Sequence, residues 1–202
     1  LSAFGGVVLC NFKINEKIAK KISSIFFEMV LAKGFDKKAL KIFGYRKNLV
    51  LIDISKFKNN KNQKIKYFGN SFLIQDQNRK IIERKKLKFV TKLKPSKMEL
   101  KYAEFAFNMC KFVKSNSIVI TNKFSTIGIG AGQPSRLDSC SIATHKAYKF
   151  QPKKLKNSVA ASDAFFPFPD GIEELANAGV EAIIQPGGSI NDKKIIAAAN
   201  NA

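Results

Sequence analysis

Two glycine-rich turns constrain the fold of this chain most: GIGAG at residues 128–132 and PGGS at residues 186–189. Each turn follows a short apolar run of strand length and precedes a helical pattern. After residue 156, the strand SVAAS, the helix DGIEELANAG, the strand EAIIQP and the helix SINDKKIIAAAN follow one another. This alternation is the layout of an α/β layer. A turn from strand to helix is also a common place for backbone N–H groups that point at an anion.

The rest of the chain alternates less regularly. Apolar residues at helical spacing predict helices over 15–32, 36–45 and 96–115, and a further helix is expected to start at Pro134. Strands are predicted at 48–54, on both sides of Gly69-Asn70, at 86–92 before Pro95, and in a hairpin at 117–121 and 126–130, with a polar connection at 55–64. The residues suited to cap helices are Asn15, Asp36, Ser96 with Glu99, and either Ser189 or Asn191.

The composition bounds the class of protein. The chain has 202 residues, of which 45% are hydrophobic and 25% charged, enough for one domain or two small lobes. No apolar run approaches the ~20 residues that span a bilayer, so no membrane association is expected. The three cysteines are far apart, which indicates neither a disulfide framework nor a CxxC metal site. We therefore expect a reducing, cytoplasmic setting.

The formal net charge of +21 makes nucleic acid the first partner to weigh. Lysines are spread through nearly every segment up to residue 156, whereas arginine, the residue best suited to phosphate and guanine, occurs at only four positions. This distribution favours a solvated lysine surface over a dedicated nucleic-acid face. A basic surface still favours anionic small substrates.

Several common chemistries have no motif here. The chain has no GxxxxGK[ST] phosphate loop, and GIGAGQ does not fit GxGxxG followed by an acidic ribose ligand. The HxE and PCxxC motifs of zinc deaminases are also absent. The single histidine, His145, is expected to face solvent on a helix, so no side chain with a natural near-neutral pKa is available as a general base.

Long segments of the chain resemble one family. SNSIVITNKFSTIGIGAGQPSRLDS and SDAFFPFPDGIEELANAGVEAIIQPGGSINDKKII are similar to the transformylase region of bifunctional purine biosynthesis proteins, which join an AICAR transformylase to an IMP cyclohydrolase. SAFGG and FLIQDQNRKIIERKKLKFVTKLKPSKMEL match the same family in the same order. The resemblance implies cytidine-deaminase-like lobes, each a three-layer α/β/α fold without the zinc, assembled as a homodimer. Residues 1–95 would be the end of the first lobe and 96–202 most of the second.

The resemblance also implies a reaction. The amine of AICAR would attack the formyl carbon of 10-formyltetrahydrofolate, giving FAICAR on the path to IMP. Because the lone pair of that amine is delocalised, catalysis must come from positioning, proton removal and stabilisation of an oxyanion. The implied residues are Asn116 at the reacting centre; Gly5, Glu28, Asn116 and Arg136 for AICAR; Leu137, Phe165, Phe168, Asp170, Ser189 and Ile190 for folate; and Ser115, Ser117 and Asp163 near a potassium ion.

Each of these residues also has an ordinary structural explanation. Without the resemblance, Asn116 would be a polar residue at a strand entry, Arg136 a surface arginine, Gly5 a turn residue and Glu28 an exposed helix glutamate. The phenylalanines would be core residues, as we expect of Phe166 in any case.

Departures from the family pattern limit the transfer of function. Pro169 stands where arginine is usual, Lys33 where proline is usual, and Asn70 replaces part of a Gly-Gly pair. The family's Lys-His catalytic pair lies upstream of SAFGG, and its cyclohydrolase domain is not in this sequence, so we expect the isolated chain to contribute half a site. The alternatives are a catalytically inactive folate- or nucleotide-binding domain and a basic RNA-binding module.

Overall fold

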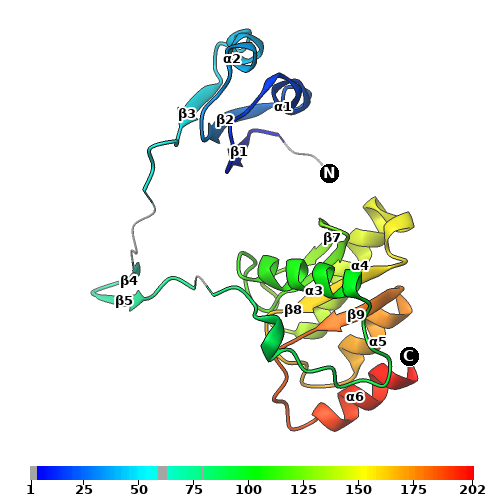
Figure 1. The fold of residues 1–202 in the computed structure, drawn as a ribbon. Helices are drawn as coiled ribbons and strands as arrows, with labels where there is room; N and C mark the ends of the chain where they lie inside the picture. The colour runs from blue at the N-terminus through cyan, green and yellow to red at the C-terminus, as the bar shows by residue number, and fades with distance from the viewer. Residues whose placement is uncertain (1–3, 59–62, 79) are drawn as a thin grey trace. The chain divides into compact units, whose positions relative to one another are not determined.

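The computed structural model describes residues 4–58, 63–78 and 80–202. Three stretches lie outside this description: residues 1–3, which include the start of the SAFGG match, residues 59–62 of the polar connection predicted at 55–64, and residue 79. The chain divides into two compact units, Leu1–Gln77 and Asn78–Ala202. Both units contain helices and strands (Figure 1), which confirms the α/β class. The division falls before residues 78–95, which we had predicted to belong with the first lobe.

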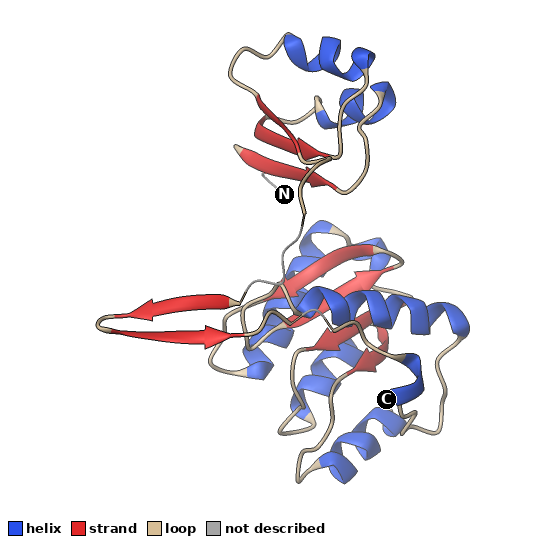
Figure 2. Cartoon of the chain, turned by 60° about the vertical axis from the view of Figure 1, so that its left-hand side comes forward, coloured by secondary structure: helices blue, strands red, loops and turns tan. Residues whose placement is uncertain are grey.

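The first unit is built on a parallel sheet. The order β1-β2-β3 is parallel throughout, and a helix connects each consecutive pair of strands. Both helices cover the same face of this sheet (Figure 2), where Val30, Ala32 and Phe43 are among the buried residues. The elements are β1 Gly6–Cys10, α1 Glu16–Ile22, β2 Phe27–Ala32, α2 Lys37–Gly44 and β3 Val50–Asp53.

The helix predicted over 15–32 is wrong in its second half. Asn15 caps α1 as expected, with its side chain accepting from the Ile18 N–H group at 3.0 Å, but the helix ends at Ile22. Residues 27–32 form β2 instead, whose inward side chains alternate with outward ones. The run FFEMVLA satisfies helical and strand spacing alike, and pairing with β1 and β3 decides the outcome. Glu28 is therefore an exposed strand residue, not a helix residue.

A two-stranded antiparallel hairpin follows, with β4 Lys64–Phe68 and β5 Ser71–Gln75 joined at Gly69-Asn70. The two extended stretches predicted here are thus confirmed. Gly69 has a φ of 54°, the left-handed conformation that a tight turn needs and that glycine adopts without strain.

The second unit is a four-stranded mixed sheet between two layers of helices. The strand order is β7-β6-β8-β9, with β6 antiparallel to both neighbours and β8 parallel to β9. On one face, α3 packs against Val119 and Ala161. On the other, α4, α5 and α6 bury Ile118, Ile120 and Ala160. The elements are α3 Lys97–Cys110, β6 Ile118–Asn122, β7 Ser125–Gly130, α4 Arg136–Phe150, β8 Ser158–Ser162, α5 Asp170–Asn177, β9 Val180–Ile184 and α6 Asp192–Asn201, with 3-10 turns at Arg84–Lys86 and Pro152–Lys154.

Two glycines of GIGAG allow this packing. A Cβ atom on Gly128 would collide with the backbone carbonyl of Ala143, and one on Gly130 with that of Ser139. Both carbonyls belong to α4, so the backbone of the helix lies directly against β7. Strand glycines commonly mark such a close backbone approach.

The strand predicted at 86–92 is absent. Residues 84–86 form a 3-10 turn, and the stretch that follows is irregular. It is held by side chains instead of a neighbouring strand: the Arg84 guanidinium pairs with Glu104 of α3, and the Lys92 N–H group donates to Asn200 Oδ1 of α6 at 2.8 Å. The alternating Lys and apolar residues fit a strand, but here no strand edge pairs with them.

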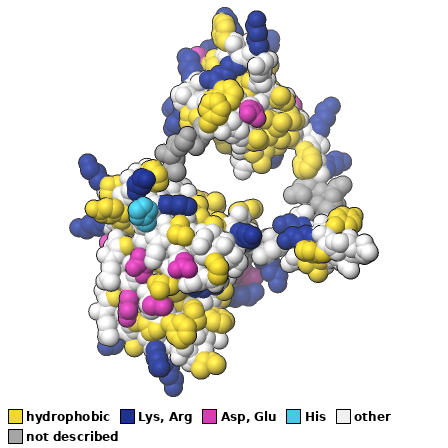
Figure 3. All heavy atoms as spheres, turned by 180° about the vertical axis from the view of Figure 1, so that it is seen from behind, with side chains coloured by type: hydrophobic (Ala, Val, Ile, Leu, Met, Phe, Trp, Pro, Cys, Tyr) yellow, Lys and Arg dark blue, Asp and Glu magenta, His cyan; other side chains and the backbone are white. Residues whose placement is uncertain are grey.

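The basic side chains do not form one cluster on the face drawn in Figure 3, where lysines and arginines are scattered over the surface. This arrangement fits the solvated lysine surface that the sequence favours. No helix of the described residues is long and apolar enough to cross a membrane.

Candidate active site

Six of the thirteen expected site residues line one pocket in the second unit. The pocket has a volume of about 300 Å³ and is formed by the segment before β6, the start of α4, and the turn between β8 and α5. Its lining residues are Asn116, Pro134, Ser135, Arg136, Leu137, Ala164, Phe165, Phe166, Pro167, Phe168 and Asp170. Asn116, Arg136 and four of the six residues expected to contact folate are thus brought together.

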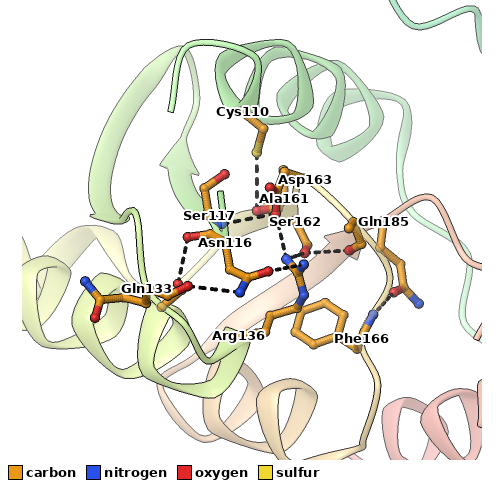
Figure 4. Close-up of polar contacts among 12 residues, drawn as sticks. Cys110, Asn116, Ser117, Gln133, Arg136, Ala161, Ser162, Asp163, Phe166 and Gln185 are labelled. Carbon is orange, nitrogen blue, oxygen red and sulfur yellow. Dashed lines mark hydrogen bonds and ion pairs between the residues drawn. The ribbon is translucent and has the colours of Figure 1, made fainter. Parts of the chain in front are cut away.

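The Asn116 side chain is held by three hydrogen bonds (Figure 4). Its Nδ2 atom donates to the carbonyl oxygens of Gln133 and Pro134, each at 2.9 Å, and its Oδ1 atom accepts from Arg136 Nη2 at 2.7 Å. The Ser139 hydroxyl donates to the Asn116 carbonyl at 2.9 Å. Both amide protons of Asn116 are therefore used, whereas Oδ1 keeps one lone pair.

The Arg136 side chain is largely shielded from solvent, so its explanation as a surface arginine is wrong. Only 8% of its side chain is exposed. Its Nη1 atom donates to Asp163 Oδ1 at 2.6 Å and to Ser162 Oγ at 2.8 Å. With the bond to Asn116, three of its five donors serve the protein. The guanidinium thus joins the end of β8 to the segment before β6.

Asp163 is the counterion of the Arg136 guanidinium. Partial burial opposes its ionisation, but hydrogen bonds from Ser115, Arg136 and the Ser117 N–H group outweigh burial and lower its pKa. The carboxylate therefore stays charged at neutral pH. The Ser117 hydroxyl is fully buried and has no hydrogen-bond partner among the described residues.

The aromatic turn after β8, residues 165–168, contains one phenylalanine that packs in the core and two that form a wall of the pocket. Phe166 is 1% exposed and confirms the expectation that it belongs to the core, whereas Phe165 and Phe168 are 43% and 58% exposed. A Cβ atom on Gly171 would lie 2.7 Å from the Phe166 ring, so glycine at that position makes room for it. The Phe166 N–H group donates to Gln185 Oε1 at 2.7 Å (Figure 4). The exposed rings of Phe165 and Phe168 consequently lie on either side of a residue whose backbone is held by a hydrogen bond.

The remaining folate candidates differ in position. Leu137 and Asp170 line the pocket, and Asp170 Oδ1 accepts from the Gly171 N–H group at 2.7 Å. Ser189 and Ile190 do not line it: they lie in the turn before α6, where Ile190 is fully exposed.

Gly5 and Glu28 belong to the first unit, which is described separately, and there they lie side by side. Gly5 has a φ of 68°, and a Cβ atom on it would come within 2.9 Å of Glu28 Oε1. A glycine is therefore required for both its conformation and its contact. The carboxylate of Glu28 lies against this bare backbone.

The other reactive side chains of the unit are inert or distant. Burial raises the pKa of the Cys110 and Cys140 thiols to about 12, so neither is a thiolate at neutral pH. His145 is exposed on α4, as expected. The residues that sequence reasoning missed are those whose contacts involve backbone groups: Ser139 and Gln185 bond a distant backbone with their side chains, and Gln133 accepts from Asn116 with its own carbonyl. No sequence pattern marks such contacts, because their partners lie 17 to 23 residues away along the chain.

Comparisons with known proteins agree on one family. Residues 1–146 match the family described as the AICARFT/IMPCHase bienzyme. The Bifunctional purine biosynthesis proteins PurH of Leptospira biflexa, Lactococcus lactis subsp. cremoris and Buchnera aphidicola subsp. Acyrthosiphon pisum are 42%, 36% and 44% identical over 201, 203 and 202 residues. Each alignment covers 99% of this chain but only 38% or 39% of the relative. The chain therefore spans about two fifths of the length of the curated relatives it matches.

Proposed function

Because the chain belongs to the AICARFT/IMPCHase bienzyme family, we propose that it forms part of a transformylase site that moves a formyl group from 10-formyltetrahydrofolate to the amine of AICAR. The product would be FAICAR, a precursor of IMP. The observation that carries the proposal is the Asn116 amide, held by Arg136 and two carbonyls beside exposed aromatic rings.

The hydrogen bonds of Asn116 favour one of its two conceivable roles. Both amide protons are already donated, so the side chain is poorly placed to stabilise an oxyanion. Its Oδ1 atom keeps a lone pair that can accept from the amine or carboxamide N–H of AICAR. Asn116 would thus aim the amine at the formyl carbon, a positioning effect that lowers the entropic part of the barrier.

Arg136 would contribute hydrogen-bond donors for an anion at the same site. Two of its five donors are not used by the contacts described above, and a nucleotide carries an anionic phosphate. Gly5 and Glu28 of the first unit are also proposed to bind AICAR, with the Glu28 carboxylate accepting from a carboxamide N–H group.

The folate side of the site would be the aromatic turn. Phe165, Phe168 and Leu137 can lie against the pterin ring, and the Asp170 carboxylate can accept from its amino and ring N–H groups. Ser189 and Ile190 would join them from the neighbouring turn. Lining residues of this kind, largely apolar with a few polar groups, are typical of small-molecule sites.

A potassium ion near Ser115, Ser117 and Asp163 is also part of the proposal. Among the described residues the buried Ser117 hydroxyl has no hydrogen-bond partner, so it is an oxygen that a bound cation would satisfy, and the pKa of Asp163 is already lowered. The residues present therefore fit a monovalent cation. The ion would hold the segment before Asn116 in place.

The proposed setting is the cytoplasm, since the three cysteines are free and buried. The proposed assembly is a homodimer of the full-length protein, which sedimentation velocity would test. A strictly monomeric full-length protein would contradict it.

The test is formyl transfer by the full-length protein beside its Asn116→Ala variant. We expect kcat to fall by about a hundredfold, because a positioning contact at the reacting centre is lost. Asn177→Ala, a change at an exposed asparagine near the end of α5, is the matched control and should retain activity. A folded protein that binds reduced folate without turnover would instead be the inactive binding domain. RNA binding with a steep salt dependence would support the nucleic-acid alternative.

A further inference from the structure

We propose that Asn191 is a positioning residue that fastens the aromatic turn to the PGGS turn, and so fixes the folate side of the site. The role of Asn191 in folate binding rests on the function proposed above. The hydrogen bonds by which Asn191 bridges the two turns all lie within the second unit.

Asn191 occupies the N-cap position of α6 but does not cap the helix. An asparagine there ordinarily accepts from an N–H group two or three residues later. Here its side chain makes no capping hydrogen bond with the helix, all of which lies in the described part of the chain. Its Nδ2 atom donates instead to the Pro167 carbonyl, at 2.8 Å and 24 residues earlier in the chain. The side chain thus serves a contact between two turns.

The backbone of Asn191 ties down the second turn. Its N–H group donates to Ser189 Oγ at 3.1 Å. The neighbouring Asp192 accepts from the Gly188 and Ser189 N–H groups at 2.8 Å and 3.1 Å. The PGGS turn is therefore closed by Asp192, and the amide of Asn191 is left to reach Pro167.

The aromatic turn is held on both sides of its buried residue. Gln185, just after β9, accepts from the Phe166 N–H group, and Asn191 donates to the carbonyl of the next residue, Pro167. Between these contacts the Phe166 ring is buried. The flanking rings of Phe165 and Phe168 are left exposed at the pocket.

Because of these contacts, the part of the pocket formed by the aromatic turn is ordered before the ligand binds. A wall that is ordered in the free protein loses less conformational entropy on binding, so its rings contribute more to affinity. Removing the Asn191 bridge should therefore weaken folate binding and leave AICAR binding unchanged, because the Asn116 and Arg136 contacts do not involve residues 165–168.

The test is the variant Asn191→Ser in the full-length protein. Serine is about as good an N-cap as asparagine, but its hydroxyl is too short to reach Pro167. We expect KM for 10-formyltetrahydrofolate to rise by about threefold to tenfold, the equivalent of one hydrogen bond. KM for AICAR and the melting temperature should be unchanged. Asn177→Ser, an exposed change on α5, is the matched control and should alter neither KM.

Two results would overturn the inference: a folate KM within about twofold of wild type, or a parallel loss of stability, kcat and both affinities, which would indicate a purely structural residue. Hydrogen exchange of the Phe165, Phe166 and Phe168 amides in the same variant is the second readout, with faster exchange expected. If the wild type transfers no formyl group, the proposed function fails and the folate role of Asn191 fails with it. The exchange rate then still decides whether the bridge exists.

Discussion

The Arg136–Asp163 ion pair offers the sharpest test of how the site is held. Asp163→Asn keeps the size of the side chain and an oxygen for the Arg136 donor at 2.6 Å, but removes the negative charge. The guanidinium is 8% exposed and cannot lose its proton, so it would stay buried without a counterion. Breaking one partner of a buried pair costs ~3–5 kcal/mol. Because 16% of the Asp163 side chain reaches solvent, which screens the charge, we expect about 3 kcal/mol.

The assay is urea unfolding of the full-length protein, with the melting temperature as a second readout. A loss of about 3 kcal/mol corresponds to a decrease of roughly 6–12 °C for a cooperative unit of about 150–250 residues. Glu104→Gln is the matched control, since it removes the partner of Arg84, whose side chain is 55% exposed, and should change stability far less. Equal effects of the two substitutions would refute the reasoning that burial of Arg136 makes its charge dependent on Asp163.

Two further predictions follow from packing. Gly130→Ala places a methyl group against the Ser139 carbonyl of α4, and we expect it to destabilise the second unit by about 3 kcal/mol, measured by urea unfolding; an unchanged midpoint would contradict the direct contact between helix and strand. Phe166→Ala should cost about 3–5 kcal/mol, whereas Phe168→Ala should leave the melting temperature unchanged and raise KM for 10-formyltetrahydrofolate. Similar melting temperatures for the two variants would argue against the division of the turn into core and wall.

Local signals predicted much of the fold. The capping box of Ser96 and Glu99 opens α3 as expected, with hydrogen bonds of 2.7 Å and 3.1 Å, because both partners lie within one turn. The hairpin of β6 and β7 is confirmed for the same reason. Failures occurred where a run fits two periods, as in FFEMVLA, or where a strand needs a neighbour, as at 86–92. Both outcomes depend on pairing with distant residues, which short-range spacing does not contain.

The site was predictable only through the family resemblance. Asn116 and Arg136 lie 20 residues apart, and Arg136 and Asp163 lie 27 apart, so nothing local connects them. Gln185 and Asn191 were beyond reach for a further reason. Their side chains bond the backbone of another turn, and a backbone partner leaves no mark on residue type. Asn191 even has the residue type of a helix cap, which concealed its other contact.

The GIGAG turn illustrates why a glycine-rich sequence does not by itself indicate an anion site. A phosphate cradle needs backbone N–H groups that are free to point outward. Here the Gly132 N–H group donates to the Lys114 carbonyl at 2.7 Å, and Gly128 and Gly130 lie inside β7, where they admit α4. The glycines thus allow α4 to pack close against the sheet. They thereby set the position of the start of that helix, where Arg136 lies. In the proposed function, an anionic nucleotide would therefore depend on side-chain donors such as the Arg136 guanidinium, because the Gly132 N–H group is already used and Gly128 and Gly130 lie within β7.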